Sequence, residues 1–332
     1  MSTEGAAVRS EILKFTAGAV LGCCVLAAQP AWSQTFPERS LRLIVPLAPG
    51  GGNDAAARVV AAGLSKRFGQ QVVVDNRPGG GSVIASQVVL GLPADGYTLY
   101  LFSTNVSMAP LLQPKLPFDT LRDFAPLSRI GISPGGLIVH PSLPVHKVMD
   151  LVALAKTRPG EITFGSSGPG GASHLGGELF NLLAKVKLLH IPYKGSAFAT
   201  TSVLSGETQV AFNNPTSSLP HIKAGRLRLV AVTTAKRWPL LPGTPTINES
   251  GVSGYEHLIW NGLAVRSGTP KAVFDRIYAG LIEELKSQQL ADLLAHDSSL
   301  PSPETPQAFL RFLEDEQKKW RPVVKQAGIS AL

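Results

Sequence analysis

The feature that most restricts the fold is a strand pattern that ends in consecutive glycines and passes directly into a helix pattern. In "LRLIVPLAPGGGNDAAARVVAAGLSKRFG" the apolar run 41–48 ends at Pro49 and Gly50–Gly52, and an amphipathic helix is predicted from Asp54 to Phe68. The first N–H groups of such a helix have no partners within the helix, and glycines let a ligand approach the backbone closely. This segment, which we call loop one, therefore predicts a site for an anion.

Strand and helix patterns alternate over most of the remaining chain. Further strands are predicted at 70–76, 97–103, 161–167, 188–193 and 208–214, with helices between them. This order predicts an α/β protein with doubly wound, mainly parallel sheets.

The pattern restarts near residue 137, and the composition shifts again after Gly254. We therefore expect two lobes, one built from residues 36–134 plus 256–332 and the other from residues 135–255 inserted between them. A chain that passes twice between lobes predicts a two-strand hinge, here at "GGLIVHP" and "LIWNGLAV", with the ligand cleft between the lobes.

A second glycine loop stands in the inserted segment. In "FGSSGPGGASHLGGELF" a strand ends at Phe164, Ser166 and Ser167 add hydroxyl donors, and Ser173 precedes the next helix; we call this loop two. Ligands of parallel α/β sheets bind at the carboxyl ends of the strands, so we expect both loops to face one cleft. The sequence allows two interpretations of His174 at the helix start. Its side chain either contacts an anion or forms a hydrogen bond with the loop backbone.

The first 33 residues have the pattern of a secretory signal. Arg9 and Lys14 precede the apolar stretch "FTAGAVLGCCVLAA", and small residues stand at Ala31 and Ser33, which predicts cleavage after Ser33. A membrane anchor is disfavoured because the apolar run is shorter than the roughly 20 residues that a span needs.

Both cysteines, Cys23 and Cys24, lie inside this segment. A lipoprotein anchor at Cys23, in "VLGC", is the alternative to cleavage after Ser33. With cleavage, the mature chain contains no cysteine, hence neither a disulfide nor a thiolate metal site.

Charge and motifs exclude several functions. The 31 basic and 23 acidic residues give a net charge of +8, but the basic residues are scattered, so no nucleic-acid partner is expected. The chain contains no G-x-S-x-G motif, and its seven histidines form neither an i, i+4 pair nor a Cys/His cluster. We therefore predict no catalytic residues, no metal and no resident cofactor.

A dinucleotide site remains the main alternative use of loop one. Gly50-x-Gly52-x-x-Ala55 fits the G-x-G-x-x-G/A fingerprint, and Asp75 ends the second strand where an acid would bind a ribose hydroxyl. This pattern indicates an NAD-dependent oxidoreductase. The signal segment argues against it, because it directs the chain to a compartment without a soluble nicotinamide pool.

The chain contains an ordered set of motifs: "FPERSLRLIVPLAPGGGNDAAARVVAAGLSKRFGQQVVVDNRPGGG", "PADGYTLYL", "LPFDTLRDFAPLSRIG", "FGSSGPGGASHLGGELF", "IPYKGSAFATTSVLSGETQVAFNN" and "HIKAGRLRLVAVTTAKRWPLLPGTPTINESG". This set resembles the Bug family, extracytoplasmic solute receptors linked to tripartite tricarboxylate transporters of bacteria. The resemblance runs from about Phe36 to Gly328. It implies a monomeric, periplasmic binding protein with a type II-like fold that is not an enzyme.

The resemblance also implies the ligand and its partners. The ligand would be a small di- or tricarboxylate, amino acid or aromatic acid, passed to membrane permease subunits or, alternatively, sensed for a histidine kinase. The implied ligand-binding residues are Gly50, Gly51, Asn53, Asp54, Ser103, Thr104, Asn105, Ser166, Ser167, Gly170, Ser173 and Asn213. The chain departs from the family pattern at Val83, at Pro169 and Ala172, and at Asn213-Asn214, where an Asp-Asn pair is usual.

Overall fold

The computed structural model describes residues 36–113, 115–215, 218–296 and 298–329. The chain divides into two compact units, Met1–Glu38 and Arg39–Leu332. Only residues 36–38 of the first unit are described, so the predicted signal segment and both cysteines lie outside the described residues. The second unit contains all the elements discussed below.

The first of its two sheets contains six strands. Their order is β11 (Leu300–Pro301), β4 (Phe124–Pro134), β10 (Leu258–Arg266), β3 (Thr98–Ser103), β1 (Leu41–Val45) and β2 (Val72–Asn76). Strands β2, β1 and β3 are parallel, with Leu43 opposite both Val74 and Leu99. Strand β10 runs antiparallel to β3 and β4, and β11 runs antiparallel to β4.

The second sheet contains five strands. Their order is β7 (Leu189–Pro192), β6 (Thr163–Ser166), β8 (Val210–Ala211), β5 (Gly136–Val139) and β9 (Arg228–Val232). Strands β7, β6 and β8 are parallel, whereas β5 is antiparallel to β8 and β9. Both sheets are therefore mixed rather than mainly parallel as predicted, because the strands that carry the chain from one sheet to the other pair antiparallel.

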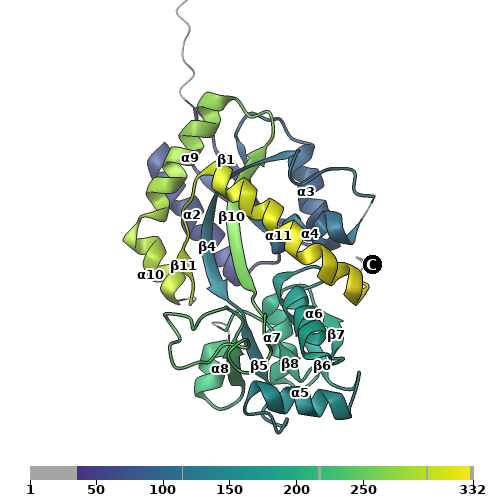
Figure 1. The fold of residues 1–332 in the computed structure, drawn as a ribbon. Coiled ribbons are helices and arrows are strands. Elements are labelled where there is room, and N and C mark those ends of the chain that lie inside the picture. The colour runs from purple at the N-terminus through teal and green to yellow at the C-terminus, as the bar shows by residue number, and fades with distance from the viewer. Residues whose placement is uncertain (1–35, 114, 216–217, 297, 330–332) are drawn as a thin grey trace, which may run out of the picture. The chain divides into compact units, whose positions relative to one another are not determined.

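We call the first sheet with its helices lobe I and the second sheet with its helices lobe II (Figure 1). The helical segments of lobe I are α2 (Gly52–Phe68), the 3₁₀ turn η1 (Gly80–Ser82), α3 (Val83–Leu90), α4 (Thr104–Leu112), α9 (Lys271–Leu285) and α10 (Gln288–His296). Those of lobe II are α5 (Val148–Thr157), α6 (Ala172–Ala184), α7 (Ser196–Leu204) and α8 (Leu219–Lys223).

The C-terminal helix α11 (Pro306–Ala327) packs against both lobes, as its diagonal course in Figure 1 shows. Phe309 and Leu313, near its start, lie in the aromatic core of lobe I. Trp320 and Val324, two or three turns later, lie in the core of lobe II. The apolar face of this helix therefore connects the two cores.

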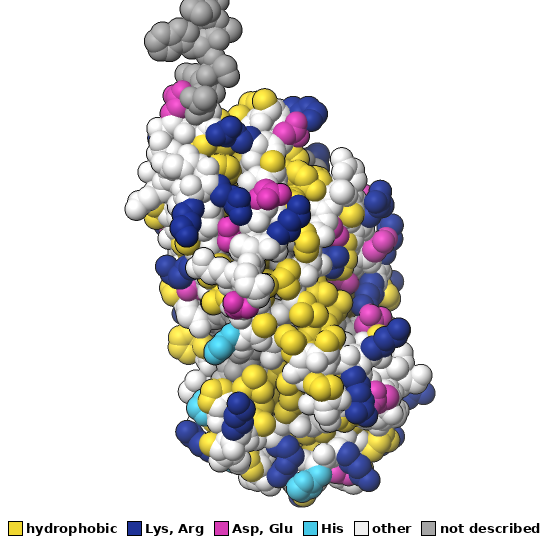
Figure 2. Space-filling view, turned by 90° about the vertical axis from the view of Figure 1, so that its left-hand side faces the viewer, with side chains coloured by type: hydrophobic (Ala, Val, Ile, Leu, Met, Phe, Trp, Pro, Cys, Tyr) yellow, Lys and Arg dark blue, Asp and Glu magenta, His cyan; other side chains and the backbone are white. Residues whose placement is uncertain are grey.

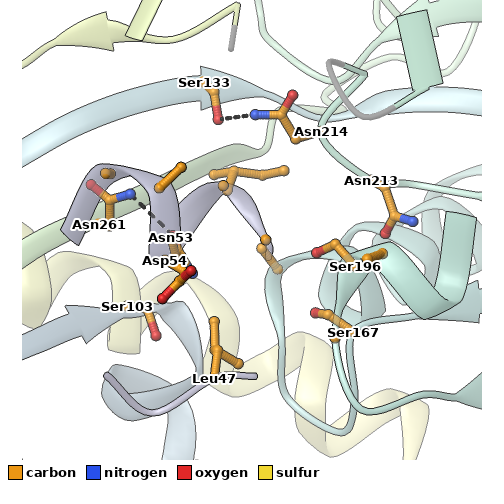
Figure 3. A pocket seen from close by; sticks show the side chains of 18 of the residues that line it. Leu47, Asn53, Asp54, Ser103, Ser133, Ser167, Ser196, Asn213, Asn214 and Asn261 are labelled. Atoms are coloured by element: carbon orange, nitrogen blue, oxygen red, sulfur yellow. Dashed lines mark hydrogen bonds between the residues drawn. The ribbon is translucent and has the colours of Figure 1, made fainter. Parts of the chain in front are cut away.

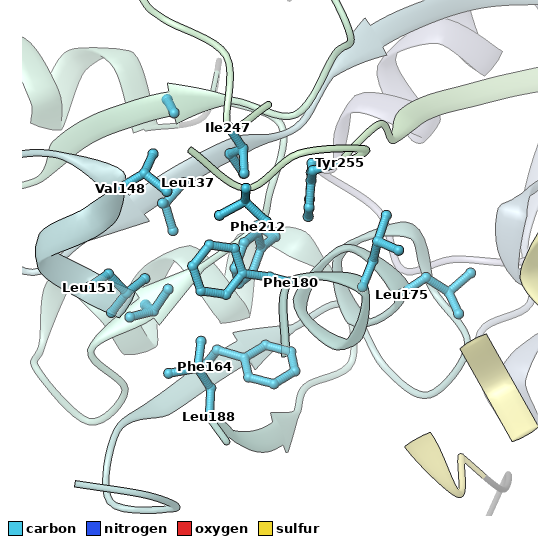
Figure 4. Close-up of a cluster of buried hydrophobic side chains, with 14 of the residues drawn as sticks. Leu137, Val148, Leu151, Phe164, Leu175, Phe180, Leu188, Phe212, Ile247 and Tyr255 are labelled. Atoms are coloured by element: carbon cyan, nitrogen blue, oxygen red, sulfur yellow. The ribbon is translucent and has the colours of Figure 1, made fainter. Parts of the chain in front are cut away.

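Three buried phenylalanines form the centre of lobe II (Figure 4). The ring of Phe212 meets those of Phe164 and Phe180 edge-on or tilted, with centroids 5.9 and 5.5 Å away. Burying each ring contributes about 1.5–3 kcal/mol to folding. Because Phe164 belongs to β6, which ends at Ser166, this packing fixes the start of loop two.

The chain crosses between the lobes at two segments that lie side by side. The first crossing is Gly135, between β4 and β5. The second is the segment after β9 that begins at Thr233, before the predicted crossing "LIWNGLAV", which forms β10 within lobe I. The Thr233 hydroxyl accepts a hydrogen bond from Gly135 N and donates one to His257 O, each 2.7 Å long. Thr233 N also donates to Gly135 O at 2.9 Å, so one buried threonine joins the crossings.

We expect Thr233→Val to lower the free energy of unfolding by about 2–6 kcal/mol. Valine keeps the shape, but it leaves Gly135 N–H and His257 O without these partners, and each unsatisfied buried group costs about 1–3 kcal/mol. Urea denaturation measures the change. As a control, Thr157→Val removes an exposed hydroxyl bond to Leu154 O and should change stability by no more than about 0.5 kcal/mol. Equal effects would show that the crossing bonds do not stabilise the fold.

Candidate functional site

A cavity of about 360 Å³ is lined by residues of both lobes. Its volume lies in the range of about 300–1,000 Å³ that is usual for small-molecule sites. Figure 3 shows Asn53, Asp54 and Ser103 of lobe I on one side and Ser167, Ser196 and Asn213 of lobe II on the other. Loop one and loop two therefore face one cavity.

Four helices of the described chain begin at this cavity. They are α2 and α4 from lobe I and α6 and α7 from lobe II, with lengths of 17, 9, 13 and 9 residues. None has a side-chain hydrogen bond at its N-cap, in contrast to α11, where the Thr305 hydroxyl accepts from Ala308 N. Each of the four N-termini therefore offers backbone N–H groups and the positive end of its dipole to an anion.

Several buried polar atoms at the cavity have no hydrogen-bond partner within the described structure. They are Ser103 Oγ, Thr104 Oγ1, Asn213 Oδ1 and Asn261 Oδ1. Such groups cost free energy unless a ligand or an ordered water satisfies them. Ser103 and Thr104 stand where β3 passes into α4, so their hydroxyls add donors at a helix start.

Asp54 holds loop one in shape. Its Oδ2 accepts hydrogen bonds from Gly50 N at 3.1 Å and Arg58 Nε at 2.9 Å, and its Oδ1 accepts from Asn76 Nδ2 at 3.0 Å. Burial alone would raise the pKa of this carboxyl, but these hydrogen bonds and the charge of Arg58 together hold the pKa below its usual value. The charged side chain of Asp54 therefore stabilises the conformation of loop one, and both of its oxygens already accept hydrogen bonds from the protein.

Loop two is supported by a stacked pair of histidines. The rings of His174 and His190 lie 3.7 Å apart at 11°; His174 Nδ1 accepts from Gly170 N at 3.0 Å, and His190 Nε2 bonds the Ser166 hydroxyl at 2.6 Å. Burial, and then the charge of His190, lower the pKa of His174 to about 3, and burial lowers the pKa of His190 to about 4. Both rings are therefore neutral near pH 7. Of the two interpretations of His174, the structure shows the one in which its ring bonds the backbone of loop two.

Most residues proposed from the sequence lie at the cavity. They are Gly50, Gly51, Asn53, Asp54, Ser103, Thr104, Asn105, Ser167, Ser173 and Asn213. Ser166 and Gly170 do not line it, because each bonds one histidine of the stacked pair behind the loop.

The sequence analysis missed a further set of lining residues. These include Leu47, Ser133, Lys194, Ser196, Ala197, Phe198, Asn214, Ile259, Trp260, Asn261, Leu294, His296 and Ser299. A signal existed for one group: "YKGSAF" places Gly195 between β7 and α7, repeating the strand, glycine and helix order on a smaller scale. Asn261 has no local signal, since only the fold brings its amide within 3.0 Å of Asn53 Oδ1.

The structure does not favour a dinucleotide at loop one, and the face in Figure 2 does not have the basic stripe that a nucleic acid would need. Asp75, the predicted ribose ligand, forms a bidentate pair with Arg77 at 2.9 and 3.1 Å and is not among the described residues at the cavity. On the face in Figure 2, Lys and Arg side chains are spread among acidic and hydrophobic ones and form no continuous stripe.

The described residues offer neither a metal cluster nor a membrane-spanning helix. No group of three or more His, Cys, Asp or Glu side chains in this part of the chain is placed to hold a metal ion. No helix there has both the length and the apolar character needed to span a bilayer.

We expect Asp54→Asn to lower the free energy of unfolding by about 1.5–3 kcal/mol at neutral pH, the range for hydrogen bonds to charged groups. The folded pKa of Asp54 is depressed, so its contribution is present above the ordinary value of 3.8 and is lost as the pH falls through the folded pKa. Denaturation curves of the two proteins between pH 7 and pH 2 should therefore converge at the acid end. The control Asp315→Asn, which breaks an exposed pair with Lys318, should change stability by less than about 1 kcal/mol. A deficit that persists unchanged in acid would contradict this assignment.

The chain matches a family model described as "Tripartite tricarboxylate transporter family receptor" over residues 56–329. It is 34% identical to protein BugT of Bordetella pertussis over 315 residues, covering 93% of this chain and 97% of that protein. It is 32% identical over 316 residues to the UPF0065 protein in the tcbD-tcbE intergenic region of Pseudomonas sp. strain P51, covering 95% and 94%. The solved structure of R. palustris Rpa4515 with adipate aligns with a TM-score of 0.85 at 37% identity, covering 90% of this chain and all of that one. The expected two-lobed α/β fold is thereby confirmed, and the chain belongs to the tripartite tricarboxylate transporter receptor family.

Proposed function

We propose that this protein is a periplasmic receptor that binds a small carboxylate between its lobes and delivers it to the membrane permease subunits of a tripartite transporter. The observation that carries the proposal is the meeting of four uncapped helix N-termini at one cavity. Backbone N–H groups at helix starts are donors that suit a carboxylate without any arginine. The hydroxyls of Ser103 and Thr104, which have no partner in the described structure, add two more hydrogen-bond donors.

The family and its relatives support this choice of ligand. The R. palustris relative was solved with adipate, a small dicarboxylate, and it aligns with this chain over both lobes. The buried side-chain atoms at the cavity that have no hydrogen-bond partner in the described structure belong to hydroxyl and amide groups, which suit binding. We therefore propose a receptor and not an enzyme.

Location and partners follow from the sequence and the family. The signal pattern of residues 1–33, with cleavage after Ser33, would release the protein into the periplasm. We propose that the protein functions as a monomer and binds its permease transiently. If the protein instead serves a sensor kinase, its ligand would still bind in the same cavity.

We propose that residues 36–134 plus 256–332 and residues 135–255 close on the ligand as two bodies, with the ligand held by the cavity residues of loops one and two, by Ser103–Asn105 and by Asn213. The two crossings joined by Thr233 would form the hinge. In this arrangement each lobe supplies two of the four helix N-termini, so closure brings both halves of the anion site onto the ligand.

A carboxylate panel tests the function. We expect at least one small di- or monocarboxylate to raise the melting temperature, because a ligand at one hundred times its Kd adds about 2.7 kcal/mol of stability. Differential scanning fluorimetry with the acids, and with NAD as the comparison, measures this. A shift with NAD and none with any acid would reject the receptor and favour the dinucleotide site.

A pair of glycine substitutions tests the site. Gly51 and Gly243 both have open space where a side chain would begin, and neither has a φ in the left-handed region, but only Gly51 lines the cavity. Gly51→Leu should therefore fold normally and weaken binding of the identified acid by about tenfold or more, about 1.4 kcal/mol. Gly243→Leu should leave the affinity unchanged in isothermal titration calorimetry. Equal affinities for the two variants would place the ligand elsewhere.

A further inference from the structure

We infer that Trp238 is a positioning residue, whose contact with Ser298 holds the end of α10 against lobe II and slows the release of a bound ligand. The inference rests on the closure of the two lobes proposed above, but it does not depend on which acid binds. Three observations carry it: a buried hydrogen bond between the lobes, the attachment of each partner to its own lobe, and the place of α10 in the cavity wall.

The indole of Trp238 forms a buried hydrogen bond between the lobes. Its Nε1 donates to Ser298 O at 2.7 Å, and Trp238 is 6% exposed. Trp238 belongs to the segment that connects β9 to β10, whereas Ser298 lies between α10 and β11. Burial of the ring and pairing of its N–H both favour the arrangement in which the lobes are in contact at this point.

The segment that carries Trp238 is attached to lobe II. Ile247 N donates to Val232 O at 3.0 Å, beside β9, and the Ile247 side chain lies in the core of lobe II. Next to the indole, Arg237 Nε donates to Glu249 Oε1 at 2.8 Å, a bond within the same segment. Any movement of lobe II relative to lobe I therefore carries Trp238 with it.

Ser298 belongs to lobe I, where it follows the end of α10. Its φ is +49°, and its N–H donates to Ala295 O at 3.0 Å. Ser299 N donates to Leu294 O at 2.7 Å, and the two bonds together form the Schellman pattern of a helix end, in which the left-handed position is usually glycine. The helix itself packs on α2, α9 and β11 of lobe I. The carbonyl of Ser298 lies beyond the last bonds of the helix, and the indole of Trp238 supplies its partner.

The end of α10 is also part of the cavity wall. Leu294, His296 and Ser299, on both sides of Ser298 in the sequence, line the cavity. Separation of the lobes about the two crossings would break the bond from Trp238 and move this wall away from lobe II. The bond therefore favours the closed arrangement, and a ligand enclosed by it leaves more slowly than it would without the bond.

Hydrogen–deuterium exchange of the ligand-free protein tests the contact between the lobes. We expect amides at the end of α10 to exchange about threefold or more faster in Trp238→Ala than in the wild type, with Trp238→Phe, which keeps a ring but no N–H, between the two. Trp320→Phe is the control, because it removes an indole bond of 3.0 Å to Glu316 Oε2 within α11 and should leave these amides unchanged. Unchanged exchange in both Trp238 variants, or an equal effect in the control, would overturn the inference.

Stopped-flow kinetics with adipate as the probe test the effect on release. Trp238→Phe should raise the dissociation rate constant by about threefold to tenfold, the effect of one hydrogen bond, and leave the association rate constant unchanged. Trp320→Phe should change neither. An unchanged dissociation rate in Trp238→Phe would overturn the inference. A wild type that binds no acid would instead contradict the proposed function, and the exchange experiment, which uses no ligand, would still decide whether Trp238 holds the lobes together.

Trp238 also provides a spectroscopic signature that a purely structural role would not produce. The other two tryptophans of the described residues, Trp260 and Trp320, are buried in the lobe cores. Opening of the lobes should therefore expose Trp238 to acrylamide, and closure on adipate should protect it. We expect adipate to reduce the quenching of wild-type fluorescence by acrylamide but not that of Trp238→Phe. A reduction of equal size in Trp238→Phe would overturn the inference.

Discussion

The structure depends on one constraint, that helix starts without side-chain caps are stable only where something else satisfies their N–H groups. In this fold four such starts meet at a single cavity, two from each sheet. The parallel strands explain how they come together, because the helices after β1, β3, β6 and β7 all begin at carboxyl ends of strands. The antiparallel strands β4, β5, β9 and β10 then carry the chain between the sheets and bring the two sets of helix starts face to face.

The polar groups around the cavity divide into those that have hydrogen-bond partners in the described structure and those that have none. Asp54 and the stacked histidines have engaged polar atoms and hold the backbone of loops one and two. Neutral histidines serve this role well, since a protonated ring behind loop two would lose the acceptor that Gly170 N requires. Ser103 Oγ and Asn213 Oδ1, by contrast, have no hydrogen-bond partner in the described structure. The engaged groups are a structural framework, so the cavity keeps its donors oriented before any ligand arrives.

The local sequence pattern was enough to predict where α2 and α6, the two longest of these four helices, begin. Gly50–Gly52 and the glycines after Ser167 separate clear strand patterns from clear helix patterns. The helix after the strand 188–193 was also predicted, but the position of its start at the cavity was not, because one glycine in "YKGSAF" resembles an ordinary turn. Strand β4 was missed because Pro126, Ser128 and Arg129 interrupt its apolar pattern; pairing with β10 and β11 stabilises it nevertheless. Contacts such as Asn53 with Asn261, 208 positions apart, depend on the return of the chain to lobe I and have no counterpart in local sequence.

In a site built from helix N-termini, the backbone provides the affinity for anions, and the side chains at the cavity determine which acid binds. The N–H groups and dipoles of the four helices belong to the backbone, so a substitution that changes only a side chain leaves them in place, unless it introduces proline. Side chains such as Leu47, Phe198 and Asn213 contribute little to holding the helix starts, so they can change while the anion site remains. One scaffold can therefore serve many acids, with the ligand chosen by a few neutral side chains that face it. Arginine-based sites lack this freedom, because there the same side chains supply both the charge and the shape.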